Sequence, residues 1–497
     1  MKKHISALIL IAMLASLAAC GGETPSTDTT APTSLDITLP PETELTDNLP
    51  NDLDFNGEKV TFLYREELLP EFYTEEETGD VVDDAVYSSM ISVEERLNVD
   101  IVVDHRPGHM LSERNNYVNH IVNAIMAGDD VYDWVDTMAV TIPANVPKGV
   151  FANLYDNKYI DVSQPWYLQG LDNMQLDSKL YFVSGDASLG YMKNAFVIYF
   201  NTQLAEDYKL GNLYTLVDDG KWTLDKMAEL SAIASQDVNG DGKYDANDKL
   251  GFLVHNYNHL VGFYGSTGTT MYEREKDGTF TLIFGDERDA SVCEKLFRVL
   301  YDSVGTFDCN LSDTTESEVQ PFNELTNKFI AGDILMMTAQ MDEAVLYLRN
   351  MQSPYGVLPF PKYDEEQKDY ITLSRSMHNV FGMPITCDSR DMAGAVMEAL
   401  ASKRHSTMLP AYFETAMKVK YSHDEDSSRM LDLIRASMTS QFEYIFCQSI
   451  GDPVLGVFRK CYSTEDGFAS TLAANKERLQ TTIDKYVVTV TEANELN

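Results

Sequence analysis

The fold is decided by residues 59–135, which read KVTFLYREELLPEFYTEEETGDVVDDAVYSSMISVEERLNVDIVVDHRPGHMLSERNNYVNHIVNAIMAGDDVYDWV. Three short runs rich in β-branched and aromatic residues predict strands at 60–64, 99–103 and 131–135. Apolar residues recur every three or four positions between these runs, which predicts helices at 82–97 and 118–125. Gly128 supplies a left-handed cap for the second helix. The β-α-β-α-β order predicts parallel strands joined by right-handed crossovers.

Open sheets of this kind bind ligands beyond the carboxyl ends of their strands. Three places satisfy this rule, namely residues 64–66, the segment after Val103 and residues 136–138. We therefore expect Tyr64, Arg65 and Thr137 to contact a ligand.

The regular alternation of predicted strands and helices ends after about residue 150. Apolar patterns there predict a strand and turn at 180–186, a strand at 195–200 that runs into a helix, a helix capped by Thr223, a buried strand at 334–340, and amphipathic helices at 430–446 and 469–486. Such a change is expected where the chain crosses into a second lobe.

The N-terminus carries a secretion signal. Lys2 and Lys3 precede an apolar run too short to span a bilayer, which ends in Leu17-Ala18-Ala19-Cys20. This ending resembles the lipobox of bacterial lipoproteins, in which the chain is cut before the cysteine and the cysteine is lipid-modified. An ordinary signal peptide with a chance cysteine is the alternative. We expect a signal peptide at 1–19 and a mature chain anchored at the outer face of the cell membrane through Cys20.

Residues 20–54 are expected to form a disordered acidic linker. The stretch 21–58 contains no Lys or Arg, nine Asp or Glu and five prolines, so it cannot bury enough apolar area to offset the entropy of ordering. The whole chain of 497 residues carries a net charge of −40, which repels nucleic acid and anionic lipid headgroups and excludes both as direct partners. Its 44% hydrophobic content predicts a substantial core.

The cysteines after Cys20 number five, so at least one thiol stays unpaired in a monomer. Pairing of Cys293 with Cys309, or of Cys447 with Cys461, stays open, although buried free thiols are the favoured interpretation. No Cys and His spacing indicates zinc.

Several stretches along the chain carry a family resemblance. They are the lipobox, Pro165-Trp166-Tyr167, Lys179-Leu180-Tyr181, Ile198-Tyr199-Phe200-Asn201, Gly220-Lys221-Trp222-Thr223, Phe329-Ile330-Ala331-Gly332-Asp333, Tyr355-Gly356-Val357-Leu358-Pro359-Phe360-Pro361 and Asn379-Val380-Phe381-Gly382-Met383. By their order and spacing the chain resembles the extracellular solute-binding lipoproteins of ABC-type importers, in the carbohydrate-binding branch (family 1). The resemblance covers most of residues 57–497, and no single motif is diagnostic.

The resemblance implies a type II periplasmic-binding-protein-like α/β fold, in which two lobes, each a sheet sandwiched by helices, close like a hinge. It places lobe one at 55–196 plus 380–422 and lobe two at 197–379 plus 423–497. It also implies a monomer that captures a sugar or oligosaccharide and delivers it to permease subunits without catalysing a reaction. Peptides and other solutes stay open as ligands.

Sugar recognition needs an aromatic face and planar polar groups. Trp166 follows a proline in an irregular segment and is the best stacking candidate, whereas Trp134 and Trp222 fit core positions better. Further polar candidates at predicted strand ends or crossings are Asp186, Gln340, Arg375 and His378. The acidic body disfavours an anionic ligand, although a local arginine such as Arg65 or Arg375 could overrule that average.

Residues 237–248, DVNGDGKYDAND, fit a twelve-residue calcium loop. The expected ligands are side-chain oxygens and one main-chain carbonyl, from Asp237, Asn239, Asp241, Lys243 (carbonyl), Asp245 and Asp248. We expect a structural Ca²⁺, and a merely acidic turn is the alternative. No second copy of the repeat supports a dockerin.

Motifs of common catalytic sites are missing from the sequence: it contains no GxSxG, HExxH or GxxxxGK[ST]. A secreted carbohydrate-active hydrolase and a subunit that presents its ligand to a membrane sensor are the alternatives to a transport protein.

Overall fold

The computed structural model describes residues 47–309, 320–348, 351–413 and 425–496, which all belong to one unit, Leu45–Asn497. The expected signal peptide 1–19, Cys20 and most of the expected linker lie outside the described residues. Among the helices of the described part, none is both long enough and apolar enough to cross a membrane.

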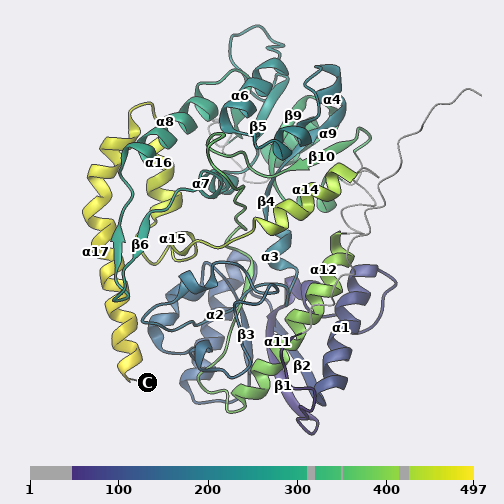
Figure 1. The fold of residues 1–497 in the computed structure, drawn as a ribbon, viewed down its shortest axis with the longest axis vertical. Helices are drawn as coiled ribbons and strands as arrows, with labels where there is room; N and C mark the ends of the chain where they lie inside the picture. Colours follow the sequence, from purple (N-terminus) through teal and green to yellow (C-terminus); the bar gives the residue numbers. More distant parts are fainter. Residues whose placement is uncertain (1–46, 310–319, 349–350, 414–424, 497) are drawn as a thin grey trace, which may run out of the picture. The chain divides into compact units, whose positions relative to one another are not determined.

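The first sheet contains the predicted β-α-β-α-β unit (Figure 1). Its strand order is β11-β3-β1-β2, in which β1 runs parallel to β2 and β3, and β11 runs antiparallel to β3. The elements are β1 (Glu58–Arg65), α1 (Val81–Leu97), β2 (Val99–Arg106), α2 (Leu111–Met126), β3 (Trp134–Met138) and β11 (Asn379–Gly382). The prediction of parallel strands is confirmed for β1, β2 and β3.

Local signals set the ends of these helices. The Asp80 carboxylate caps α1 by accepting the backbone N–H of Val82 at 2.8 Å and of Asp83 at 3.3 Å. Gly128 follows α2 with a φ of +79°, as predicted for a left-handed cap.

The third strand begins later than predicted. The Thr61 backbone N–H donates to the Asp133 carboxylate at 2.8 Å, so the Asp133 side chain takes the place of a backbone partner. Regular strand pairing starts at Trp134. Pairing with β11 then extends β3 to Met138, so residues 136–138 belong to the strand instead of following it.

The second sheet has the order β10-β4-β9-β5-β8. Strand β4 runs antiparallel to β9 and β10, and β5 runs parallel to β8 and β9. The strands are β4 (Phe196–Asn201), β5 (Leu250–Val254), β8 (Thr306–Asp308), β9 (Ile334–Gln340) and β10 (Tyr355–Leu358). Every residue of β4 and β9 is buried, which confirms the strand predicted at 195–200 and the buried strand predicted at 334–340.

Residues 180–186 form no strand, so that prediction is wrong. Backbone pairing is limited to isolated bridges, from Val183 to Phe381 and from Gly185 to Tyr167. The partners lie in two different segments, so no continuous ladder develops along the apolar run.

Helices cover both sheets. They include α3 (Gly190–Lys193), α4 (Thr202–Asp207), α5 (Leu213–Asp218), α6 (Leu224–Ile233), α7 (Val261–Ser266), α8 (Glu287–Tyr301), α9 (Gln320–Ala331), α10 (Glu343–Leu346), α11 (Arg390–Ser406) and α12 (Met408–Ala411). Thr223 caps α6 as predicted, by accepting the Lys226 N–H at 3.3 Å. A two-stranded sheet is formed by β6 (Tyr272–Arg274) and β7 (Phe280–Leu282).

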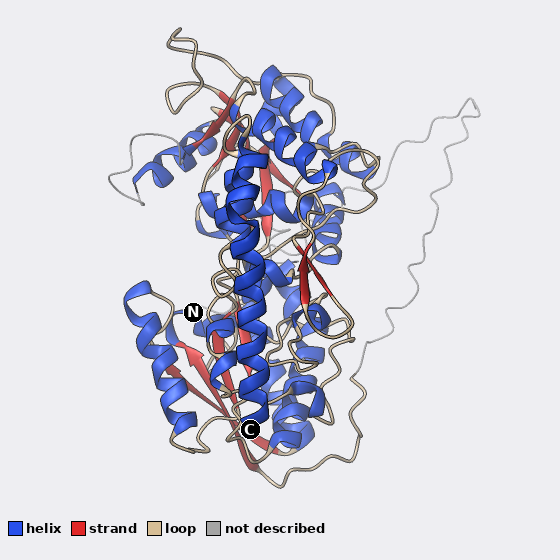
Figure 2. Cartoon of the chain, turned by 90° about the vertical axis from the view of Figure 1, so that its left-hand side faces the viewer, coloured by secondary structure: helices blue, strands red, loops and turns tan. Residues whose placement is uncertain are grey.

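The C-terminal part is helical, as predicted, but divided differently. It comprises α14 (Glu425–Ala436), α15 (Phe442–Ile445), α16 (Arg459–Tyr462) and α17 (Gly467–Leu496). Helix α17 packs beside β7 and is the long vertical helix that ends at the C-terminus in Figure 2. It also reaches residues of the predicted first lobe, because the Tyr486 hydroxyl donates to the Pro143 carbonyl at 2.7 Å and the Tyr181 hydroxyl donates to Asn494 at 2.8 Å.

All five described cysteines are free, and four of them are buried. The two pairings considered from the sequence do not form. The Cys293 thiol is instead hydrogen-bonded with that of Cys461.

Candidate functional site

The candidate site lies where the ends of β1 and β3 in the first sheet and of β4 and β9 in the second sheet meet the segments that precede β4 and β11. In the first sheet Leu63 pairs with Val135, so Arg65 and Thr137 lie at one level two residues later. In the second sheet Gln340, the last residue of β9, pairs with Phe196, the first residue of β4. The segments just before β4 and β11 pair with each other, because the Arg375 N–H donates to the Asn194 carbonyl at 2.9 Å.

Arg65 is held by Asp136 at this edge. Its Nε donates to Oδ2 at 2.7 Å and its Nη2 to Oδ1 at 3.1 Å, and both side chains are buried. Burial lowers the pKa of Arg65, but the charge and hydrogen bonds of Asp136 raise it above its usual value. Nη1 is buried and has no partner among the described residues. Arg65 therefore presents a fixed, charged N–H donor.

Arg375 and Gln340 continue the site. The Arg375 Nη1 donates to Gln340 Oε1 at 3.2 Å, and Gln340 Nε2 donates to Asn194 Oδ1 at 3.5 Å. In the described part of the chain, the buried Nε of Arg375 and Oγ1 of Thr137 find no hydrogen-bond partner. Both atoms therefore have unused hydrogen-bonding capacity within the described residues.

His378 offers an acceptor. Its Nδ1 lies 2.8 Å from the Arg375 carbonyl and must donate, because a carbonyl only accepts. Burial lowers the pKa of His378 to about 4, and the positive charge of Arg65 acts in the same direction. The ring is therefore neutral at pH 7, and Nε2, which has no partner within the described residues, keeps its lone pair.

Two further residues of this region were not named from the sequence, His109 and Arg114. They lie in the segment after Val103, to which the strand-end rule pointed without selecting a residue. Arg114 Nη2 donates to the His109 carbonyl at 3.4 Å. Burial lowers the pKa of Arg114, and the charges of Arg65 and Arg375 lower it further, so the three guanidinium groups lie within electrostatic reach. We call Arg65, Arg114 and Arg375 the arginine cluster.

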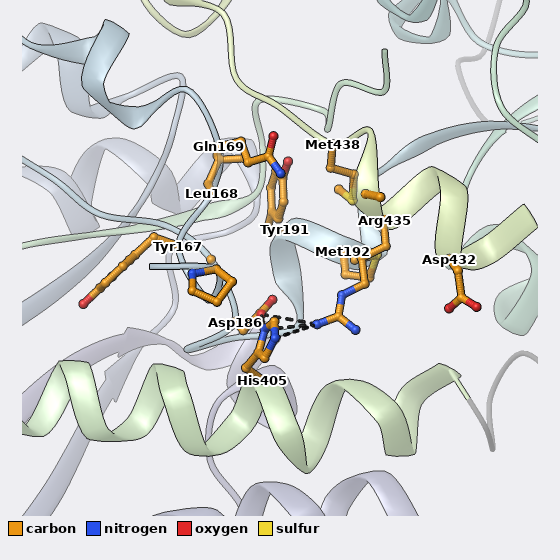
Figure 3. Close-up of a pocket in the computed structure, with 13 residues that line it drawn as sticks. Tyr167, Leu168, Gln169, Asp186, Tyr191, Met192, His405, Asp432, Arg435 and Met438 are labelled. Carbon is orange, nitrogen blue, oxygen red and sulfur yellow. Dashed lines mark hydrogen bonds and ion pairs between the residues drawn. The ribbon is translucent and has the colours of Figure 1, made fainter. Parts of the chain in front are cut away.

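A pocket of about 340 Å³ is lined in part by Tyr191, whose ring also contacts His378 (Figure 3). On one side His405 Nδ1 lies 2.5 Å from Asp186 Oδ2 and 3.0 Å from Arg435 Nη2. On the other side, Figure 3 shows Gln169, Tyr191 and Met438.

Tyr191 contacts the residues at the sheet edges and also lines the pocket. Its ring lies edge-on to His378, with 5.3 Å between the ring centroids, and it also lines the pocket. Its hydroxyl is buried without a partner in the described residues. Burial raises the pKa of Tyr191, and the Asp186 charge raises it further, so the hydroxyl stays protonated and can donate.

The structure thus places most of the predicted ligand-binding residues together. Arg65, Thr137, Gln340, Arg375 and His378 meet at the joined sheet edges, and Asp186 lines the adjacent pocket. Tyr191, Arg114, His405 and Arg435 were missed.

Two predicted contacts lie beneath the surface. Tyr64 is fully buried, stacks on Phe72 and hydrogen-bonds with Ser188 and Asn379. Trp166 is 1% exposed and its indole N–H donates to Glu398 at 3.2 Å. In this conformation neither ring offers a face to a sugar, and Tyr167 lines the pocket beside them.

The other two tryptophans occupy core positions, as predicted. Trp134 donates to the Ala393 carbonyl at 2.9 Å and Trp222 to the Pro359 carbonyl at 2.8 Å.

The predicted calcium loop forms a tight series of turns. Gly240 and Gly242 have φ values of +76° and +79°, and both donate to Asp237, at 2.6 and 2.9 Å. Burial raises the pKa of Asp248, but hydrogen bonds from the backbone of Asp245, Val238 and Asn239 outweigh it and hold the pKa below its usual value. Four carboxylates, an amide and a carbonyl are an oxygen donor set that suits Ca²⁺.

A second group that could hold a metal lies under β9. His255, His259 and Glu343 are buried, and their ligand atoms lie within 4.8 Å of one another, the only such group of three His, Cys, Asp or Glu side chains within the described ranges. Glu343 lies 3.2 Å from His259 Nε2 and 3.5 Å from His255 Nδ1. The three side chains make the same buried contacts without any ion.

Comparisons with known proteins identify the fold. No family model matches the sequence, and no curated protein matches it. The structure is similar to an ABC substrate-binding protein from Listeria monocytogenes in complex with cycloalternan, with a TM-score of 0.52 and 13% identity over 86% of this chain and 99% of that one. It is similar to the cyclic α-maltosyl-1,6-maltose binding protein from Arthrobacter globiformis, with a TM-score of 0.56 and 12% identity over 86% and 99%.

A third similar structure is the galacto-N-biose-/lacto-N-biose I-binding protein of the ABC transporter from Bifidobacterium longum, with a TM-score of 0.53 and 10% identity over 87% and 98%. Each match spans nearly the whole of the other chain. The protein therefore has the two-lobe, periplasmic-binding-protein-like α/β fold of ABC solute-binding proteins, as the sequence predicted.

Proposed function

We propose that this protein captures a sugar or oligosaccharide outside the cell and delivers it to the permease subunits of an ABC-type importer. One observation carries the proposal. Polar side chains from both sheets meet at the segments that join them, and several of their buried polar atoms lack a partner among the described residues. Unsatisfied buried polar groups are costly, so they favour a ligand that supplies partners.

The donor and acceptor pattern suits hydroxyl groups. Arg65 and Tyr191 donate, His378 accepts, and Thr137 can do either. Binding with this pattern needs no proton transfer or covalent step, and the similar structures are named as binding proteins. The proposal is therefore a binding protein without catalytic activity, and we expect it to act as a monomer.

Thermal unfolding of the chain lacking residues 1–20, across a panel of mono- and oligosaccharides, tests the proposal. A ligand at one hundred times its Kd stabilises the folded state by about 2.7 kcal/mol and shifts the melting temperature. Chromatography of the incubated sugars checks that no product forms. Product release would instead establish the hydrolase, and a panel without any shift would contradict carbohydrate binding.

We also propose that Cys20 is lipid-modified after removal of residues 1–19 and holds the protein at the outer face of the cell membrane. The Cys20→Ala variant is then expected to leave the membrane fraction, and intact-mass measurement of the wild type should show the acyl groups. An unmodified Cys20 in the mature chain would contradict the anchor.

Residues 237–248 are proposed to bind a structural Ca²⁺ through Asp237, Asn239, Asp241, Asp245, Asp248 and the Lys243 carbonyl. Chelation should lower the melting temperature of the wild type but not that of the Asp237→Asn, Asp241→Asn double variant. Equal melting temperatures of the wild type with Ca²⁺ and with chelator would contradict the calcium site and favour an acidic turn without a bound ion.

A further inference from the structure

The proposed site carries more positive charge than a neutral sugar requires. Of the three guanidinium groups in the arginine cluster, only Arg65 has an ion-pair partner among the described residues, namely Asp136. Arg114 and Arg375 donate to uncharged acceptors, the His109 carbonyl and the Gln340 side chain. Two positive charges are therefore left without a counter-charge in a protein whose net charge is −40.

Three acidic side chains around the cluster make their contacts elsewhere. Both Glu67 oxygens lie within hydrogen-bond distance of the Gly108 nitrogen, and one also accepts from His109. Glu71 pairs with Lys193 at 2.7 Å, and Glu343 pairs with two histidines. Within the described residues, none of these carboxylates forms an ion pair with Arg114 or Arg375.

The guanidinium N–H donors without a partner also favour an anionic ligand. Arg65 Nη1, Arg114 Nε and Arg375 Nε are all buried, and none has an acceptor in the part of the chain that the structure describes. A planar guanidinium binds carboxylate and sulfate oxygens through parallel N–H donors, and these charge-assisted bonds are stronger than bonds to neutral hydroxyls. A carboxylate or sulfate would supply acceptors and the missing negative charge together.

We infer that the ligand is an acidic saccharide, which carries a carboxylate or a sulfate, and that the arginine cluster binds this group while the adjoining pocket beside Tyr191 holds a sugar ring. The inference rests on the proposed function and names its ligand class. It departs from the expectation, based on the average charge of the chain, that an anionic ligand is disfavoured.

Isothermal titration of matched sugar pairs tests the inference. The pairs are galactobiose with digalacturonate, and unsulfated with sulfated chondroitin disaccharide, each at low and at physiological salt. At least one acidic sugar is expected to bind ten times more tightly than its less charged counterpart, and this preference should shrink as salt rises. The pair that shows the preference distinguishes a carboxylate from a sulfate.

Arginine variants test the cluster itself. Arg114→Gln and Arg375→Gln should each weaken binding of the acidic sugar at least tenfold and reduce its preference over the less charged counterpart. Arg274→Gln is the matched control, because it removes the same charge from an exposed strand position. Unchanged melting temperatures of the ligand-free variants establish that they fold.

Each contrary result has a separate meaning. Neutral sugars that bind as tightly as acidic ones, or variants that keep the preference, would overturn the inference while the proposed function stands. Inorganic sulfate that binds as tightly as the acidic sugar would overturn the need for a saccharide. Binding of no sugar at all would overturn the proposed function and the inference with it.

Discussion

Replacing Glu398 by Gln is expected to remove a pH dependence from the stability of the fold. Glu398 lies on α11 and is 2% exposed. It accepts the Tyr167 hydroxyl at 2.7 Å and the Trp166 indole N–H at 3.2 Å. Burial raises the pKa of Glu398 to about 7, although these two hydrogen bonds oppose the rise.

The sign follows from proton counting. Between its ordinary pKa of 4.5 and the folded-state pKa of about 7, Glu398 holds a proton in the folded protein and loses it in the unfolded chain. Stability therefore falls as pH rises through this window. At 1.36 kcal/mol per pH unit, the loss from this one group amounts to about 3 kcal/mol between pH 4.5 and pH 7.

Glutamine keeps an oxygen for the indole N–H and carries no charge at any pH. The measurement is urea unfolding of the wild type and of Glu398→Gln at pH 5 and pH 8. The free energy of unfolding of the variant relative to the wild type should rise by about 3 kcal/mol from pH 5 to pH 8. Glu206→Gln, at an exposed position of α4, is the control and should show no such change.

Two results would refute this reasoning. A relative stability of Glu398→Gln that stays constant within about 1 kcal/mol across the window would mean that Glu398 ionises normally in the fold. A pH-dependent difference of the same size in Glu206→Gln would mean that the effect comes from overall charge.

Three other substitutions have defined outcomes. Asp136→Ala leaves the Arg65 guanidinium buried without its partner, so urea unfolding should show a loss of about 3–5 kcal/mol, and a loss below about 1 kcal/mol would contradict a buried ion pair. Gly185→Ala places a methyl group 2.2 Å from the Trp166 carbonyl, at a φ of +147°, and should markedly lower the melting temperature; an unchanged value would contradict this backbone contact. Thr223→Ala removes the N-cap of α6 and should cost about 1 kcal/mol, whereas Thr223→Ser should restore most of it.

The first sheet could be predicted because its signals are local. The helix between β1 and β2 has an acidic cap at Asp80, an apolar stripe and a left-handed stop at Asn98, all within one stretch of sequence. Parallel pairing then follows from connection length and handedness alone.

The errors arose where a distant segment decides the structure. Strand β3 extends to Met138 because β11, more than 200 residues later, pairs with it. Residues 180–186 have strand-like composition, but their neighbours offer only single bridges, to Phe381 and to Tyr167. No periodicity within either segment contains that information.

The residues of the candidate site also differ in whether local sequence could predict them. Arg65 and Thr137 follow from the rule that ligands meet the carboxyl ends of strands. Arg114, His405 and Arg435 lie on helices, and their approach to the site depends on how α2, α11 and α14 pack. A helical arginine has the same sequence signature whether it meets water or a ligand, so composition could not select these three.

The average charge of the chain does not determine the charge at the site, as the sequence argument allowed for Arg65 and Arg375. The excess of acidic residues is summed over the whole chain, but at physiological salt an exposed charge is largely screened beyond about 8 Å. The electrostatics at the site therefore depend on which nearby acids have a cationic partner, as Asp136 has in Arg65 and Glu71 has in Lys193. Arg114 and Arg375 have no ion-pair partner among the described residues and reach only uncharged acceptors. Acidic surroundings then favour specificity, since they repel anions everywhere except where the arginine cluster compensates.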